Sequence, residues 1–135
     1  MTLHVSADVG PLDKLDASLV SRLSNIVRTF AFVVEGRAKT SIQTGTKSGR
    51  VYPRPGGKSH RASAPGEAPA TDTGLLVNSI RSASEQGLTW RVSASARYAA
   101  LLELGSRRVA PRPFLAPALE SVKASFLKAI EGVFR

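Results

Sequence analysis

The longest hydrophobic pattern in this chain covers residues 13–42, where apolar side chains recur at steps of three and four residues. Such spacing is typical of an amphipathic helix, which Asp13 or Asp16 can cap at its start and which Gly45 ends. A helix of this length rises roughly 40 Å, which is long for so small a chain. We expect either a core helix with one exposed face or a helix that packs between subunits. Its apolar positions are Leu15, Leu19, Leu23, Ile26, Val27, Phe30, Val33, Val34, Ala38 and Ile42.

A shorter, alternating pattern predicts a β-hairpin in the second half of the chain. Residues 80–84 and 88–95 form its strands, and residues 85–87 form the turn between them. In the second strand apolar and polar residues alternate, so one face is expected to be buried and the other solvent-exposed. The apolar positions of that strand are Leu88, Trp90, Val92 and Ala94.

Three more helices are expected around this hairpin, at residues 75–80, 96–104 and 114–134. Gly105 ends the second of them. The prolines that follow keep residues 107–112 extended, because they disfavour the helical conformation in the residues before them. The patterns together predict an α+β fold with a long N-terminal helix, a small antiparallel sheet, a C-terminal helix and a long protruding basic loop.

Residues 45–72 interrupt the periodic pattern with four prolines and five glycines. Structureless segments of this length are uncommon inside compact domains and are usually functional or disordered. We therefore predict a single domain over residues 1–135, with residues 45–72 as an extended assembly loop that a neighbouring subunit or partner holds. The alternative is a surface loop packed on its own domain. The basic residues of the loop are Lys47, Arg50, Arg54, Lys58 and Arg61.

The overall charge narrows the range of partners. The chain has 19 Lys+Arg against 10 Asp+Glu, a formal charge of +9, which favours polyanions through counterion release. Apolar residues make up 42% of the chain without any run near the roughly 18 residues that span a bilayer, so neither a disordered chain nor a membrane protein is expected. The chain has no cysteine, which excludes disulfides and thiol chemistry. No secretion signal is expected at residues 1–12.

The tripeptide Asp-Thr-Gly at residues 72–74 matches that of aspartic proteases. Those enzymes place it after an apolar strand, whereas here Ala-Pro-Ala precedes it and a helix-like segment follows. We therefore interpret Asp72 and Thr73 as the cap of the short helix, where their side-chain oxygens can accept hydrogen bonds from its first amides.

Two further features fail to complete a reactive site. His4 and His60 have neither a histidine partner at metal-binding spacing nor a matching serine and aspartate. The Gly-Lys-Ser sequence at residues 57–59 lacks the strand and the helix of a phosphate loop. We expect no enzyme, no catalytic residues, no metal and no cofactor.

Three stretches of the sequence carry a resemblance to a known family. The first joins residues 49–52 and 60–70, the second is residues 72–80, and the third is residues 98–106 closing with residues 112–120. Together they are similar to the tail-component family of long-tailed bacteriophages of the Hong Kong 97 type, over roughly residues 15–134. The most specific parts are Asp-Thr-Gly-x-Leu, Tyr-Ala-x-x-Leu-Glu-x-Gly and Arg-Pro-Phe-Leu-x-Pro-Ala-Leu-Glu, in this order. Gly105-Ser106 stands where Gly-Thr is common.

This resemblance implies a structural virion protein at the neck or tail-completion position, where the DNA-filled head joins the tail tube. It implies a homo-oligomeric ring, expected to be a hexamer, made in the host bacterial cytoplasm. Its partners would be adjoining neck or head-completion proteins, tail-terminator or tail-tube proteins, and DNA in the channel. Closed rings of this kind use heterologous interfaces. The residues expected at the assembly interface are Arg50, Tyr52, Arg54, His60, Arg61, Arg107, Arg108, Arg112 and Phe114.

Phe114 is also expected to hold the proline-rich turn in the core of its own subunit. The alternative function is a basic nucleic-acid-binding module that binds DNA as a monomer, with an affinity that falls steeply as salt rises. The sequence leaves open whether the basic residues face DNA or acidic surfaces of neighbouring proteins.

Overall fold

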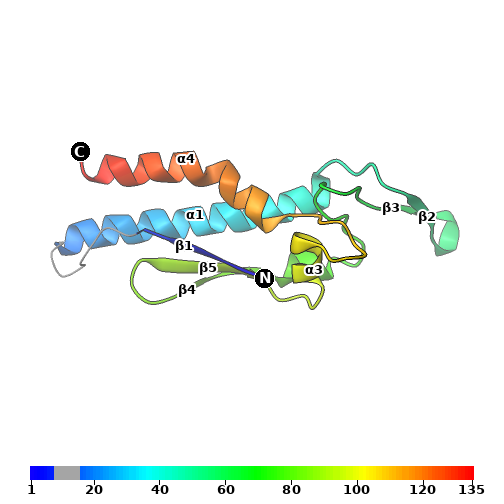
Figure 1. Cartoon of the computed structure of the whole chain (residues 1–135). Coiled ribbons are helices and arrows are strands. Elements are labelled where there is room, and N and C mark those ends of the chain that lie inside the picture. The colour runs from blue at the N-terminus through cyan, green and yellow to red at the C-terminus, as the bar shows by residue number, and fades with distance from the viewer. Residues whose placement is uncertain (8–15) are drawn as a thin grey trace.

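The computed structural model describes residues 1–7 and 16–135, and it confirms the predicted α+β fold (Figure 1). In chain order the elements are β1 (Thr2–Ser6), α1 (Ala17–Thr44), β2 (Val51–Pro53), the 3₁₀ turn η2 (Pro55–Gly57), β3 (Ser59–Arg61), α2 (Leu75–Ser79), β4 (Ile80–Ser84), β5 (Thr89–Ala94), α3 (Ala99–Leu104) and α4 (Leu115–Val133).

The long helix α1 lies at the centre, between α4 on one side and a three-stranded sheet on the other (Figure 1). Asp16 caps its start, because a side-chain oxygen of Asp16 accepts a hydrogen bond from the backbone N–H of Leu19 at 2.8 Å. At the other end the N–H of Gly45 bonds to the carbonyl of Ser41. Both predicted boundaries are thus confirmed, whereas Asp13 and Leu15 lie outside the described residues.

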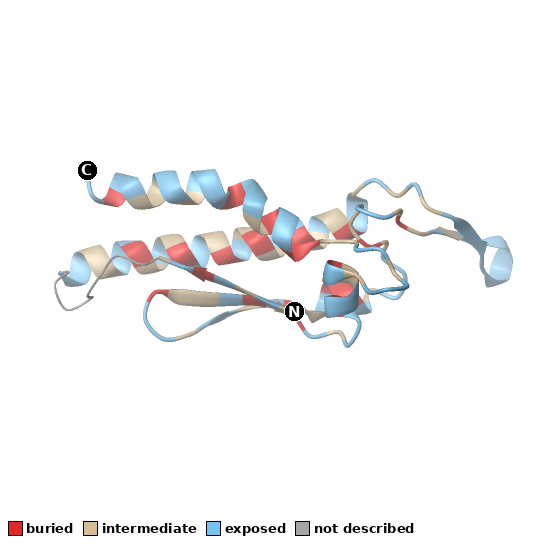
Figure 2. Cartoon of the chain, in the orientation of Figure 1, coloured by how far each residue is buried: buried red, intermediate tan, exposed pale blue. Residues whose placement is uncertain are grey.

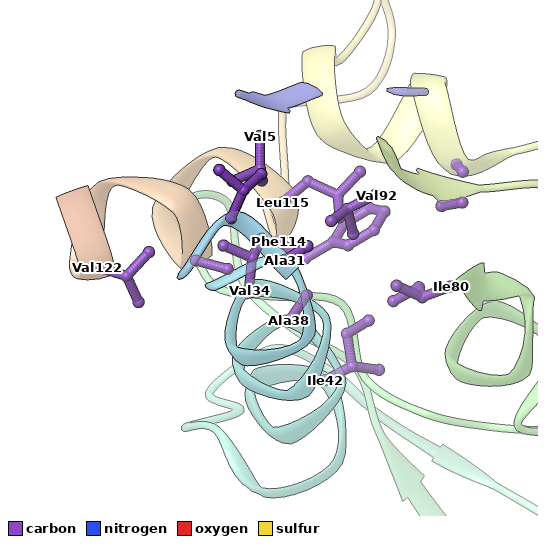
Figure 3. Packing of buried hydrophobic residues seen from close by; sticks show 14 of the residues in the cluster. Val5, Ala31, Val34, Ala38, Ile42, Ile80, Val92, Phe114, Leu115 and Val122 are labelled. Atoms are coloured by element: carbon purple, nitrogen blue, oxygen red, sulfur yellow. The ribbon is translucent and has the colours of Figure 1, made fainter. Parts of the chain in front are cut away.

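The apolar stripe of α1 forms the middle of the core (Figures 2 and 3). By length and composition alone this helix could cross a membrane, but a buried core helix passes the same test, and α1 has such a buried stripe. Phe30 of α1 meets Phe126 of α4 edge to face, with ring centroids 5.2 Å apart. The fully covered positions of the stripe are Leu23, Val27, Ala31, Val34, Ala38 and Ile42.

The sheet has the strand order β1-β5-β4, with both pairs antiparallel. The predicted hairpin of β4 and β5 is confirmed, and Val92 and Ala94 point into the core as expected. Strand β1 was not predicted. Its short alternation of Leu3 and Val5 with polar residues carries a weak signal, and pairing with β5 is what makes it a strand.

The helices of the second half of the chain follow the prediction closely. Helix α3 begins at Ala99 rather than residue 96 and ends at Gly105, whose positive φ of 73° suits glycine. A Cβ atom on Gly105 would stand 2.9 Å from Pro111, so the chain also needs glycine here for space. Helix α4 covers the predicted range to within one residue at each end.

Candidate assembly interface

Residues 49–62, which we call the arm, form a two-stranded ribbon that leaves the rest of the molecule. Strands β2 and β3 pair antiparallel, and η2 turns the chain at the tip. The ribbon extends beyond the end of α1, and residues 51–59 are all exposed (Figures 1 and 2). The interpretation of residues 45–72 as a loop without secondary structure was therefore wrong for this part. Strands of three residues around a Pro-Gly-Gly tip are too short to give a periodic signal.

The pairing of the ribbon gathers basic and aromatic side chains on one face. Tyr52 lies opposite His60, and beyond them the N–H of Arg54 bonds to the carbonyl of Lys58 at 2.8 Å. Because residues two apart in a strand share a face, Arg50 joins this set, and its guanidinium lies 5.6 Å from the centre of the Tyr52 ring. We call this set the basic face of the arm. Its members are Arg50, Tyr52, Arg54, Lys58 and His60.

Not every predicted contact residue of the loop belongs to this face. Arg61 pairs with Val51 on the opposite face, and one of its guanidinium nitrogens donates to the carbonyl of Gly49 at 3.2 Å. The sequence interpretation had placed Arg61 with Arg50, Tyr52, Arg54 and His60 in one group of residues. The structure separates it from them, because only even-numbered positions of the arm share the basic face.

Lys47 holds the base of the arm, by which we mean residues 47–49 and 62–68 at its two ends. Its ammonium donates to the carbonyl of Ser41, in the last turn of α1, at 2.9 Å and to the carbonyl of Ala68 at 2.8 Å. Lys47 thereby joins the end of α1 to the segment that follows the arm. Burial lowers the pKa of Lys47, and the nearby Glu67 carboxylate partly opposes this shift. Lys47 is therefore a structural residue, not a free charge of the loop.

Glu67 closes the base from the other side. Its carboxylate accepts hydrogen bonds from the hydroxyl of Ser48 at 2.5 Å, the N–H of Ser48 at 2.9 Å and the N–H of Ala64 at 2.8 Å. These bonds, the Ser48 hydroxyl first among them, lower the pKa of Glu67 to about 2. Beside it the two segments of the arm approach so closely that a Cβ atom on Gly49 would stand 2.6 Å from the carbonyl oxygens of Ala62 and Ser63.

A second carboxylate holds the proline-rich turn, residues 105–113, against the body. Glu103 of α3 is buried, with 5% of its surface exposed. Its two oxygens accept hydrogen bonds from three successive backbone amides at the start of α4. The three N···O distances are 2.8 Å to Phe114, 3.0 Å to Leu115 and 2.8 Å to Ala116. Glu103 thus satisfies amides that a helix leaves unpaired and places a negative charge at the positive end of its dipole.

The predicted contact residues of the turn have different surroundings. Arg107 and Arg108 are exposed, as a contact surface requires. The side chain of Arg112 instead donates to the carbonyl of Ser63 at 3.3 Å, so it ties the turn to the base of the arm. Phe114 is 1% exposed and lies at the centre of the core, near Val92 (Figure 3). Its expected role inside its own subunit is confirmed, and its place in the assembly interface was wrong because no neighbour can reach the ring.

The predicted helix cap at Asp72 and Thr73 also needs correction. The cap residue of α2 is Gly74, which has no side chain that could accept a hydrogen bond from the helix. The carboxylate of Asp72 forms an ion pair with the guanidinium of Arg54 on the arm, and both side chains are nearly half exposed. Only Thr73 is placed as expected, with its hydroxyl 3.4 Å from the N–H of Leu75. The long-range arginine partner was not visible in the local sequence.

An exposed apolar patch near the arm was missed altogether. It is made by α2 and α3 and the residue before α3, and two of its members, Leu75 and Tyr98, line a hollow of about 260 Å³. The side chain of Leu104 is 69% exposed, more than any other large apolar side chain in the described residues. The members of this patch are Leu75, Tyr98, Leu101 and Leu104. The sequence signal for this patch is the apolar content of two short helices. A short apolar helix is easily taken for a core helix.

No family model, curated protein or solved structure matches this chain. Among residues 1–7 and 16–135, no three histidine or acidic side chains gather in a way that could hold a metal ion.

Proposed function

We propose that this protein is a structural virion component that forms a ring at the head–tail junction of a long-tailed phage or phage-like particle. In this role it joins the DNA-filled head to the tail and surrounds the DNA path. The basis for the identity is the three-part resemblance in sequence. The neighbours would be head-completion or neck proteins on one side and tail-terminator or tail-tube proteins on the other.

The observation that carries the proposal is the arm. A two-stranded hairpin standing alone in water is marginally stable at best. Here a hairpin with three-residue strands extends from the body, and hydrogen bonds of Lys47 and Glu67 hold its base in place. This arrangement suits a part that is completed by another molecule, as expected for a subunit that assembles.

The apolar patch on α2 and α3 supports assembly as well. Exposed apolar residues that gather in one place mark interaction sites more often than scattered ones do. The arm and the patch are different surfaces of one subunit, so contacts between copies would be heterologous. Such contacts close into a ring when the rotation between neighbours is right.

The test is to remove the arm without disturbing its base. Replacing residues 51–61 by Asn-Gly joins Arg50 to Ala62, which are already hydrogen-bonded in the ribbon, through a favoured two-residue turn. We expect a folded subunit with an unchanged thermal midpoint that fails to join heads to tails. A control variant with Leu127→Ala on α4 changes an exposed apolar residue far from the arm and should assemble normally. Intact, infectious particles carrying the shortened arm would rule out the role given to it.

The second candidate is a basic nucleic-acid-binding module, and the basic face of the arm favours it. The two functions differ in their response to phage tails. Light scattering of the purified protein, with and without tails, should show larger particles only with tails if the neck function holds. A monomer that ignores tails but binds duplex DNA would favour the second candidate.

A further inference from the structure

The basic face of the arm has a composition that is unusual for a ribbon between two protein surfaces. Arg50, Arg54 and Lys58 contribute three full positive charges, and Tyr52 and His60 contribute two flat rings between them. Residues 46–66 contain no acidic side chain at all. Basic and aromatic side chains interleaved on one exposed surface suit the phosphates and sugars of a nucleic acid.

The shape of the arm fits the same partner. The major groove of B-form DNA is about 12 Å wide and admits a two-stranded β-ribbon. The arm is such a ribbon, and its exposed residues 51–59 extend beyond the end of α1 (Figure 2). Its tip, the Pro-Gly-Gly of η2, is narrow and uncharged, so it can enter a groove while the charges behind it meet the phosphates.

The ion pair between Arg54 and Asp72 shows how such binding would be controlled within the chain. Asp72 is the acidic group that the arm's basic face meets in this subunit. One carboxylate oxygen of Asp72 occupies the position on the guanidinium where a phosphate oxygen would bind, through the same kind of charge-assisted hydrogen bond. Since both side chains are nearly half exposed, solvent screens the pair and an incoming phosphate can displace it at little cost.

We propose that the basic face of the arm binds the backbone of duplex DNA, and that Arg54 exchanges Asp72 for a phosphate when it does so. This rests on the proposed function only for the source of the DNA, which would be the genome passing the head–tail junction. The binding is independent of base sequence, because contacts to phosphates and sugars carry no sequence information.

The first measurement is the affinity of the full chain for a short mixed-sequence duplex, by fluorescence anisotropy at several salt concentrations. Three phosphate contacts predict a slope of about −2.7 in log affinity against log salt, or a loss of about 40-fold between 50 and 200 mM salt. The Asn-Gly variant that lacks residues 51–61 should lose most of the binding. Undiminished binding by that variant would overturn the proposal, because the charge of the body alone would then explain it.

Two matched pairs of variants test the individual residues. Arg54→Gln should reduce the salt slope by about 1, whereas Arg22→Gln, which removes an equal charge from the exposed side of α1, should not. Asp72→Asn should raise the affinity roughly 2- to 5-fold, more than Glu120→Gln on α4, because it also releases Arg54. In the Arg54→Gln background this extra gain should vanish. Equal effects within either pair would contradict the exchange at Arg54.

Binding to a polyanion that has no grooves distinguishes DNA from an acidic protein as the partner of the arm. Poly-glutamate of similar charge should bind the full chain more weakly than the duplex does. Equal or tighter binding would overturn the choice of DNA and assign the basic face of the arm to an acidic protein surface. Failure of these binding tests would leave the head–tail joining assay unaffected, and failure of that assay would leave DNA binding by the arm unaffected.

Discussion

Glu103 and Glu67 do the same chemical work in two very different parts of the molecule. Each carboxylate collects three hydrogen bonds around the end of a proline-rich segment, Glu103 at the turn and Glu67 at the base of the arm. Glu103 is buried beneath the start of α4, whereas the bonds of Glu67 to Ser48 are exposed to solvent. The first joint belongs to the core of the subunit, and the second holds a part that leaves the subunit.

The difference shows how burial decides what a proline-rich segment does. The turn is followed by Phe114 and Leu115, which enter the core and bring the turn with them. The arm holds Val51 and Tyr52 at the corresponding place, and both stay exposed. A bond inside the body is worth more because water does not compete for it. We therefore expect changes at the turn to affect folding and changes at the arm to affect binding.

The largest difference in stability between a change at the turn and a change at the arm should come from two aromatic side chains. Phe114→Ala empties a fully buried site, and large-to-small changes of this kind cost about 3–5 kcal/mol. Tyr52→Ala removes a ring that is 46% exposed on the arm, so its effect on the free energy of unfolding should stay within about 0.5 kcal/mol. Urea denaturation of both variants measures the difference. Comparable losses would mean that the arm is part of the folding unit, contrary to the division drawn above.

The next largest effect is expected at Glu103. Glu103→Ala leaves the amides of Phe114 and Leu115 buried without an acceptor, which should cost about 3 kcal/mol. Glu103→Gln keeps one acceptor oxygen and should cost less. Glu120→Ala on the exposed side of α4 is the matched control and should change stability by no more than about 0.5 kcal/mol. A Glu103→Ala variant as stable as this control would show that the start of α4 does not depend on the carboxylate.

Much of the body could be predicted because its signals are local. The three- and four-residue steps of α1, the alternation of β5 and the glycine after α3 each lie within one element, and each was confirmed. Strand β1 was missed because a five-residue strand depends on its partner β5, which lies far away in sequence.

The candidate interface was harder to predict for the same reason. Asp72 looked like a helix cap from its neighbours, but its partner Arg54 lies 18 residues away. Glu103 attracted no attention as a single acidic residue in a short helix, because its three partner amides appear only when α3 folds against the start of α4. The even-numbered basic residues of the arm became one face only after the register of β2 and β3 was known.

The smallest expected effect concerns Glu67 and depends on pH. Its pKa is lowered from 4.5 to about 2 in the folded chain by the hydroxyl of Ser48 and by the N–H groups of Ala64 and Ser48. A folded pKa below the unfolded one means that the group stabilises the native state fully above pH 4.5, and that this contribution is lost as pH falls toward 2. The stability difference between the native chain and Glu67→Gln should therefore shrink over this range.

The arm should open at low pH, when Glu67 is protonated, before the body does. A carboxyl-carbon NMR titration of Glu67 should give a midpoint near 2, and Ser48→Ala should move this midpoint toward 4.5 because it removes the strongest donor. In the same pH range the amides of Gly49 and Ala62, which bond across the base of the arm, should exchange with solvent faster than those of α1. If Glu67 titrates at its ordinary value, or if the amides of the arm and of α1 open together, then its three hydrogen bonds do not hold the arm independently of the core, and the contrast with Glu103 fails.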